Sequence, residues 1–128
     1  MRLFFIAFLI LLSLDAIANE HMLEETEYKY VAQSIGKGKP YFLELGAESC
    51  QSCKIMGSTL YKIKQEHPRY NIYFINVKKE RDVALKLEIR MIPTQIIYDK
   101  SGKEVYRHIG LLSTTELEKL FKTYLFED

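Results

Sequence analysis

The chain has 128 residues, of which 48% are hydrophobic and 27% are charged. This length and composition predict one small globular domain and exclude a fibrous or wholly disordered chain. The formal net charge is +1, and no basic stripe accompanies the tyrosines and phenylalanines. We therefore expect no nucleic-acid partner.

The first eighteen residues differ in character from the rest of the chain. Arg2 supplies a positive start, residues 3–14 form an almost unbroken apolar run, and Ala16 and Ala18 are small residues at the positions that a signal peptidase reads. A transmembrane helix needs about 20 apolar residues, which is more than this run provides. We expect a signal peptide over 1–18 and a mature domain over 19–128, with an uncleaved membrane anchor as the alternative.

The remaining residues alternate between helical and strand patterns. The expected elements, in chain order, are a first helix over 19–35, a strand over 41–45, a helix over 50–66, a strand over 71–77, a short helix over 80–88, strands over 94–98 and 103–109, and a last helix that follows a capping box over 113–116 and ends near 125. Strand–helix–strand units require parallel strands, and a hairpin turn over 99–102 adds antiparallel strands at the edge. The pattern predicts an α/β domain with a central mixed four-stranded sheet flanked by helices.

The sequence contains two cysteines, and they stand three positions apart as Cys50 and Cys53. They follow a predicted buried strand and open a predicted helix, where free backbone N–H groups and the helix dipole favour negative charge. This placement lowers the pKa of Cys50 and makes its thiolate the nucleophile. Cys53 can then attack the mixed disulfide that Cys50 forms and release the partner. We predict a catalytic pair that forms a redox-active Cys50–Cys53 disulfide.

Other chemistries for this pair are less well supported. A structural disulfide would close only a tiny loop and stabilise the fold little, although the spacing alone leaves it open. A structural zinc site generally needs four ligands, and His21, His67 and His108 show no ligand spacing. Covalent haem attachment would need a histidine where Lys54 stands. We therefore expect no metal and no cofactor.

Glu44 is the one charged residue in the predicted strand over 41–45. Burial raises the pKa of a carboxyl group, so one role for Glu44 is to accept the proton of Cys53 during exchange, through a water molecule. The alternative is a glutamate at the sheet edge whose side chain reaches solvent. Taken alone, the residue pattern favours this alternative.

Several separated segments together resemble the thioredoxin family, over about residues 38–125. They are 41–54, 89–94, 99–103 and 108–110. The resemblance implies a thioredoxin-like fold that lacks the extra N-terminal strand. It also implies that Pro93 is cis and lies beside the two sulfurs, and that the Ile92 backbone pairs with an extended substrate segment. For Pro93 alone, a proline at a strand start is the alternative. Glu44 would occupy the position where thioredoxins keep a buried acid, which favours its proton-relay role.

The chain departs from the family around the cysteines. Ser49 stands where a tryptophan usually precedes the first cysteine, and the chain contains no tryptophan. Gln51 and Ser52 replace the usual Gly-Pro between the cysteines. We therefore expect a smaller and more polar docking surface, and the reduction potential of the family does not carry over.

Together with the predicted signal peptide, the resemblance implies a periplasmic thiol–disulfide oxidoreductase that reduces disulfides in envelope client proteins, for example apocytochromes c. We expect this protein to be a monomer. Ile92 before the proline is similar to reducing members, and no histidine lies near Cys50 in the sequence to stabilise its thiolate further. A reductase in an oxidising compartment needs electrons, and the expected donor is a transmembrane thiol conductor of the DsbD/CcdA type. Two alternatives stay open: a disulfide-forming oxidase or isomerase, and a non-catalytic binding module that uses the fold as a scaffold.

Overall fold

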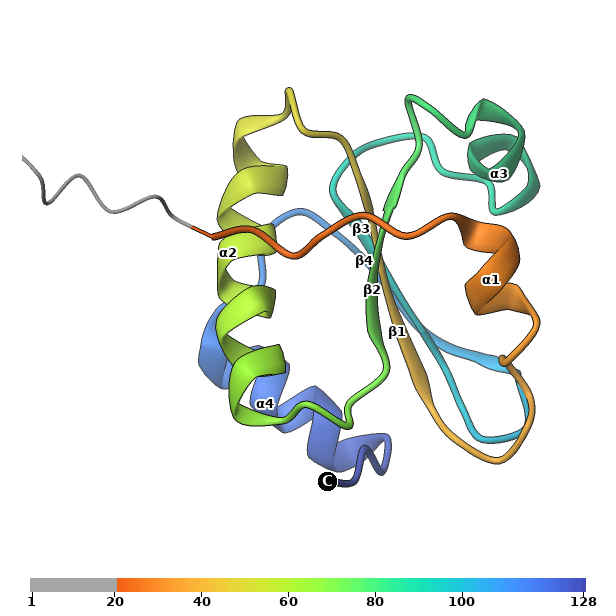
Figure 1. Cartoon of the computed structure of the whole chain (residues 1–128), viewed down its shortest axis with the longest axis vertical. Helices are drawn as coiled ribbons and strands as arrows, with labels where there is room; N and C mark the ends of the chain where they lie inside the picture. The colour runs from red at the N-terminus through yellow and green to blue at the C-terminus, as the bar shows by residue number, and fades with distance from the viewer. Residues whose placement is uncertain (1–20) are drawn as a thin grey trace, which may run out of the picture.

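The computed structural model describes residues 21–128, and the predicted signal peptide over 1–18 lies outside these residues. The helices and strands are, in chain order, α1 (Tyr28–Ala32), β1 (Tyr41–Gly46), α2 (Gln51–Glu66), β2 (Ile72–Asn76), α3 (Arg81–Lys86), β3 (Thr94–Tyr98), β4 (Glu104–Ile109) and α4 (Thr114–Thr123). Their order is the one predicted (Figure 1). Within residues 21–128 no helix has the length and apolar character needed to cross a membrane.

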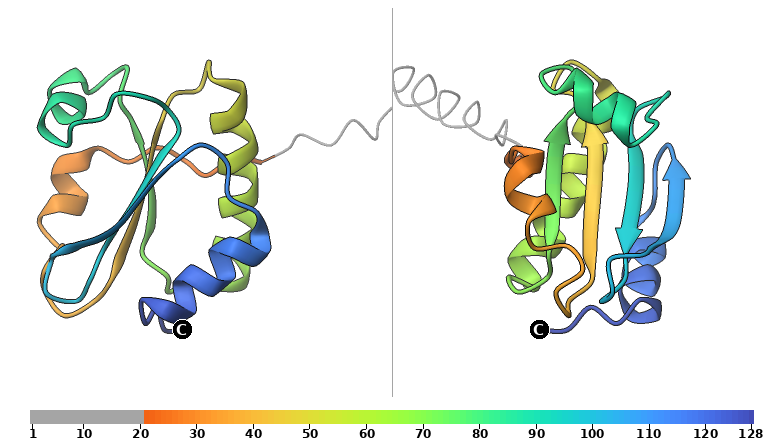
Figure 2. Two further views of the ribbon diagram at one scale, coloured as in Figure 1. Left: turned by 180° about the vertical axis from the view of Figure 1, so that it is seen from behind. Right: turned by 90° about the vertical axis from the view of Figure 1, so that its right-hand side faces the viewer.

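A four-stranded mixed sheet in the order β2-β1-β3-β4 forms the middle layer. β1 pairs with β2 in parallel and with β3 antiparallel, and β3 pairs with β4 antiparallel. Helices α2 and α4 cover one face of the sheet, and α1 and α3 cover the other (Figures 1 and 2). The predicted α/β architecture is confirmed. Of the hairpin strands only β4 is an edge strand, because β3 lies against β1 inside the sheet.

Both faces of β1 are buried, as its apolar run predicts. Successive side chains of a strand point to opposite faces of the sheet. Phe42 therefore packs in the core on the side of α2 and α4, whereas Leu43 and Leu45 pack in the core on the side of α1 and α3. Each layer of helices thus has its own hydrophobic core, and β1 contributes to both.

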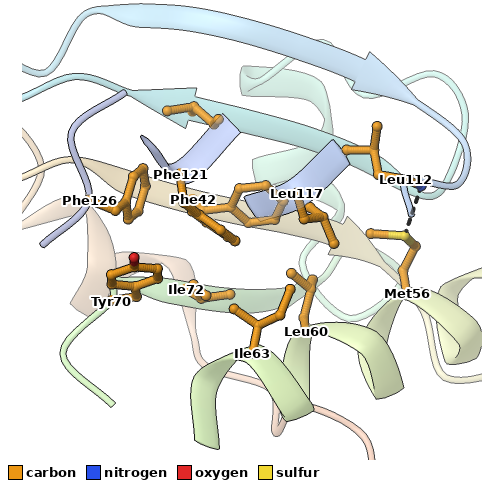
Figure 3. Packing of buried hydrophobic residues seen from close by; sticks show 11 residues of the cluster. Phe42, Met56, Leu60, Ile63, Tyr70, Ile72, Leu112, Leu117, Phe121 and Phe126 are labelled. Atoms are coloured by element: carbon orange, nitrogen blue, oxygen red, sulfur yellow. Dashed lines mark hydrogen bonds between the residues drawn. The ribbon is translucent and has the colours of Figure 1, made fainter. Parts of the chain in front are cut away.

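The larger core lies between the sheet and helices α2 and α4 (Figure 3). Its members are Phe42, Met56, Leu60, Ile63, Tyr70, Ile72, Ile97, Leu112, Leu117, Phe121 and Phe126. The rings of Phe42 on β1 and Phe121 on α4 lie with centroids 5.4 Å apart. The backbone N–H of Leu112 donates to Met56 Sδ at 3.2 Å, which holds the loop after β4 against α2 (Figure 3). This packing fixes α2, and with it the cysteines, on the sheet.

The segment before α1 is extended, so the predicted helix over 19–35 is wrong for most of its described length. Glu25 forms a parallel bridge with Phe74 on the outer edge of β2, and the Leu23 N–H donates to Gly57 O of α2 at 3.0 Å. The chain thereby crosses the sheet edge from α2 to α1 (Figure 1). The extended segment can form backbone hydrogen bonds with the edge of β2 and with α2, and a helix at this position could not form them. Within the described residues, this bridge takes the place of an extra N-terminal strand.

Candidate active site

Cys50 stands at the junction between β1 and α2. The helix begins at Gln51, and Cys50 caps it with an extended backbone (φ −91°, ψ 120°). Its Sγ accepts a hydrogen bond from the Cys53 backbone N–H at 3.3 Å, and Ser52 Oγ lies 3.6 Å away. The sulfur therefore takes the place of a helix-capping oxygen, among donors that favour a thiolate.

The two cysteines are free thiols in very different surroundings. Burial opposes the ionisation of Cys50, but hydrogen bonds from Cys53 and Ser52 outweigh it and lower the pKa of Cys50. Cys53 is fully buried, and burial together with the neighbouring Cys50 sulfur raises the pKa of Cys53 to about 12. Cys50 is thus accessible and inclined to ionise, whereas Cys53 keeps its proton. This asymmetry fits the predicted attacking role of Cys50 and resolving role of Cys53.

Gly46, the last residue of β1, makes room for the buried sulfur. A Cβ atom at this position would lie 2.9 Å from Cys53 Sγ and 3.3 Å from Cys53 Cβ. The first distance is too short for any Cβ unless its neighbour moves. A glycine here lets the first turn of α2 pack directly on the end of the strand. No local sequence pattern marks Gly46 for this role, because its contact with Cys53 arises in the tertiary fold.

Glu44 lies on β1 with its side chain fully buried, so the alternative of an edge glutamate that reaches solvent is wrong. Burial raises the pKa of Glu44 well above the ordinary carboxyl value, while a hydrogen bond from Gln95 opposes the rise and the charge of Cys50 adds to it. After burial and Cys50, the charge of Glu44 also contributes to the raised pKa of Cys53. Glu44 and Cys53 therefore lie within electrostatic reach, as a proton acceptor and its donor must. Transfer through a water molecule stays a prediction.

Gln95 and His108 hold Glu44 in place, and no sequence motif marks them for this role. Gln95 Nε2 lies 3.3 Å and 3.2 Å from the two carboxyl oxygens of Glu44 and 2.9 Å from the backbone oxygen of Gly110. Gln95 Oε1 lies 2.7 Å from His108 Nδ1. The available signal is a glutamine inside a buried strand, which the hairpin register sets opposite His108. Within residues 21–128 no group of three or more His, Cys, Asp or Glu side chains is placed to hold a metal ion.

Pro93 and Ile92 lie at the end of the sheet that carries the cysteines. The peptide bond between them is cis. Leu45 of β1 pairs with Thr94 of β3, so Pro93 comes directly beyond this pair, where β1 runs through Gly46 toward α2. Pro93 is buried and Ile92 is half-buried. Pairing of the Ile92 backbone with a substrate segment stays a prediction.

The surface at this end of the sheet combines apolar and basic groups. Met91, Ile109 and Leu111 are exposed at 62%, 52% and 50%, and they flank the proline loop and the end of β4. Lys78 Nζ donates to Ser49 Oγ at 2.7 Å. A lysine therefore stands beside the residue that precedes the first cysteine, although the two residues are 29 positions apart in the sequence. Exposed apolar side chains and a lysine therefore both lie at this end of the sheet.

The chain is similar to thioredoxins over most of its length. The profile of the thioredoxin-like domain family matches residues 29–125. The thioredoxin of Chlamydia trachomatis is 29% identical over 103 residues, which cover 80% of this chain and 99% of that protein. The thioredoxin of Mycoplasmoides gallisepticum is 28% identical over 90 residues, which cover 70% of this chain and 89% of that protein.

Solved structures show the same likeness. Mitochondrial thioredoxin 3 of Saccharomyces cerevisiae, in its oxidised form, matches with a TM-score of 0.65 and 25% identity over 80% of this chain and 94% of that one. Chloroplastic thioredoxin z matches with a TM-score of 0.71 and 20% identity over 81% and 95%, which is a likeness of fold alone. Together with the cysteine pair at the start of α2, the family match shows that the chain belongs to the thioredoxin-like family and is a protein-disulfide oxidoreductase.

Proposed function

We propose that the protein reduces disulfides of exported client proteins in the periplasm. The unequal cysteine pair carries this proposal: Cys50 is partly exposed with a lowered pKa, and Cys53 is buried with a pKa of about 12. The Cys50 thiolate attacks a client disulfide and forms a mixed disulfide, and the released client sulfur takes up a proton. Cys53 gives up its proton and attacks the Cys50 sulfur. The client then leaves as a dithiol, and the protein keeps the Cys50–Cys53 disulfide.

The direction of electron flow is inferred from the surroundings of Cys50. A strongly oxidising protein has a reduced form that is stabilised by a thiolate of very low pKa. Within residues 21–128 the hydrogen bonds to Cys50 Sγ come from the Cys53 N–H and the Ser52 hydroxyl, and no histidine or lysine forms one. Ile92 before Pro93 is also similar to reducing members of the family. Both features favour a reductase over a disulfide-forming oxidase or isomerase.

Location and partners are proposed from the sequence. Residues 1–18 have the pattern of a signal peptide, so the domain would work in the periplasm, free or tethered by an uncleaved segment. Apocytochromes c awaiting haem are clients whose disulfides need reduction there. A transmembrane thiol conductor of the DsbD/CcdA type would return electrons to the Cys50–Cys53 disulfide, because the compartment itself is oxidising.

An equilibrium redox titration tests the direction. The purified protein is equilibrated with mixtures of reduced and oxidised glutathione, and its free thiols are counted by alkylation. Cys50→Ser is the control, since it cannot form the internal disulfide. A potential near that of thioredoxin, about −270 mV, supports a reductase. A value near about −120 mV, as in the strongest disulfide-forming oxidases, would show that the proposed direction is wrong.

A trapping experiment tests clients and location. In Cys53→Ala the mixed disulfide at Cys50 cannot be resolved, so the full-length variant should accumulate client adducts in the periplasmic fraction. The matched control also lacks Cys50 and should form none. Retention of the protein in the cytoplasm would exclude an exported reductase. Full biological activity of Cys50→Ser would instead indicate a non-catalytic binding module.

A further inference from the structure

A row of polar side chains crosses the sheet from the active site to its edge. Glu44 on β1 pairs with Gln95 on β3, and Gln95 pairs with His108 on β4. Paired residues on neighbouring strands point to the same face of a sheet, so the side chains lie in line on the face covered by α2 and α4. Glu44 and Gln95 are fully buried, and His108 is half-buried on the edge strand. The row therefore joins the interior of the site to the protein surface.

The hydrogen bonds fix the orientation of the Gln95 amide. Its Nε2 faces the Glu44 oxygens at 3.3 Å and 3.2 Å and the Gly110 oxygen at 2.9 Å. Its Oε1 faces His108 Nδ1 at 2.7 Å, so this nitrogen carries the hydrogen. If the amide turned over, its oxygen would face the oxygens of Glu44 and Gly110. His108 and Gly110 together therefore keep a hydrogen-bond donor directed at Glu44.

We propose that Gln95 and His108 are positioning residues that set how readily Glu44 ionises, and thereby how fast Cys53 resolves the mixed disulfide. In this step the Cys53 proton passes to the Glu44 carboxylate, the Cys53 sulfur bonds to the Cys50 sulfur, and the client sulfur leaves with the electrons of the broken bond. Glu44 must be ionised to accept the proton, and the Gln95 donor favours its ionised form. The inference rests on the exchange chemistry of the proposed function, but not on its direction or compartment.

Other titratable groups that face this row come from α2, β4 and α4. The cysteines at the start of α2 interact electrostatically with Glu44. Tyr106 stacks parallel to the imidazole of His108 with ring centroids 6.4 Å apart, and Glu116 of α4 lies within electrostatic reach of His108. In the oxidised protein the two cysteines form a disulfide and no longer titrate. Tyr106→Phe keeps the neighbouring ring and is the matched control.

The direct test follows the carboxyl carbon of Glu44 by ¹³C NMR in a pH titration of the full-length oxidised protein. Gln95→Leu removes the donor, so the midpoint for Glu44 should rise by about one pH unit, a tenfold change in its ionisation constant. His108→Leu frees the amide to turn over and should shift the midpoint in the same direction by less. Tyr106→Phe should leave it unchanged. If Gln95→Leu fails to fold, His108→Leu at the sheet edge decides alone, and an unchanged midpoint overturns the proposal.

A kinetic comparison tests whether Gln95 acts through Glu44. A mixed disulfide between Cys50 and a model peptide is prepared, and release of the peptide is timed in wild type, Gln95→Leu, Glu44→Gln and the double variant. The double variant should release the peptide as slowly as Glu44→Gln alone. Equal slowing by Gln95→Leu in both backgrounds would show that Glu44 is not involved. A strongly oxidising potential in the glutathione titration would refute the reductase and leave this comparison unaffected.

Discussion

The free energy of unfolding of Glu44→Gln, relative to that of wild type, should increase as the pH rises. Glu44 is fully buried, and burial raises the pKa of Glu44 well above its ordinary value despite the hydrogen bond from Gln95. In the unfolded chain a glutamate ionises near pH 4.3. Above that pH the unfolded chain releases the proton while the native protein keeps it. Ionisation therefore draws the equilibrium toward the unfolded state.

Proton linkage gives the sign and the size of the effect. Below about pH 4.3 the carboxyl group is protonated in both states, and its contribution to stability is fully present. Each pH unit above that value removes up to about 1.4 kcal/mol from the free energy of unfolding of wild type, until the pH passes the native pKa of Glu44. Glutamine does not titrate, so Glu44→Gln escapes this loss. Hydrogen bonds made or missed by the introduced amide add an offset that does not depend on pH.

Urea unfolding of the oxidised protein, followed by far-UV circular dichroism between about pH 5 and 7.5, measures the effect without interference from the thiols. The free energy of unfolding of Glu44→Gln minus that of wild type should increase steadily across this range. Glu118→Gln replaces an exposed carboxylate on α4 and should show no such trend. If the Glu44→Gln difference stays constant with pH, Glu44 ionises normally in the native protein, and the inference from its burial is refuted.

Other substitutions test packing and capping. Gly46→Ala forces a Cβ to within 2.9 Å of Cys53 Sγ, so we expect a loss of about 1–3 kcal/mol in urea unfolding and slower mixed-disulfide resolution; wild-type values for both would contradict the close contact. Ser113→Ala removes the side-chain cap on the Glu116 N–H and half of the capping box of α4, which should lower the unfolding free energy by about 1 kcal/mol. Leu117→Ala opens a cavity in the larger core and should cost about 2–5 kcal/mol, and a smaller loss would mean that α4 packs loosely.

Most of the fold could be predicted because its signals are local. The hairpin turn is encoded by Asp99 and Gly102, and the Gly102 N–H indeed donates to Asp99 O at 3.0 Å. The last helix begins after Ser113, which forms the predicted capping box with Glu116. The extended segment before α1 could not be predicted, because Leu23 and Glu25 make their hydrogen bonds and contacts with residues far along the chain. The backbone N–H of Leu23 bonds to Gly57 in the middle of α2, which no local pattern reveals.

The active site divides in the same way. Cys50 and Cys53 could be identified from their spacing together with their position after a predicted strand, since a helix start places both sulfurs together and favours one thiolate. The residue pattern did not reveal the burial of Glu44, because that burial depends on β1 lying between β2 and β3 inside the sheet. The role of Gln95 could not be predicted, because it depends on the strand register. Only the pairing of the strands places Gln95 between Glu44 and the edge of the sheet. The contact of Lys78 with the residue before the first cysteine joins loops that are distant in sequence.

The row of Glu44, Gln95 and His108 lowers the stability of a small protein, and this loss of stability argues for a chemical role. The other side chains of β1 show that apolar groups fill this strand well, and a carboxyl group with a raised pKa destabilises the native state at neutral pH. The hydrogen bond from Gln95 offsets only part of the destabilisation caused by burying Glu44, because the pKa of Glu44 stays raised. A fold shaped by packing alone would carry an apolar residue at this position. A buried carboxyl group within electrostatic reach of a buried thiol that must lose its proton is instead what disulfide exchange requires.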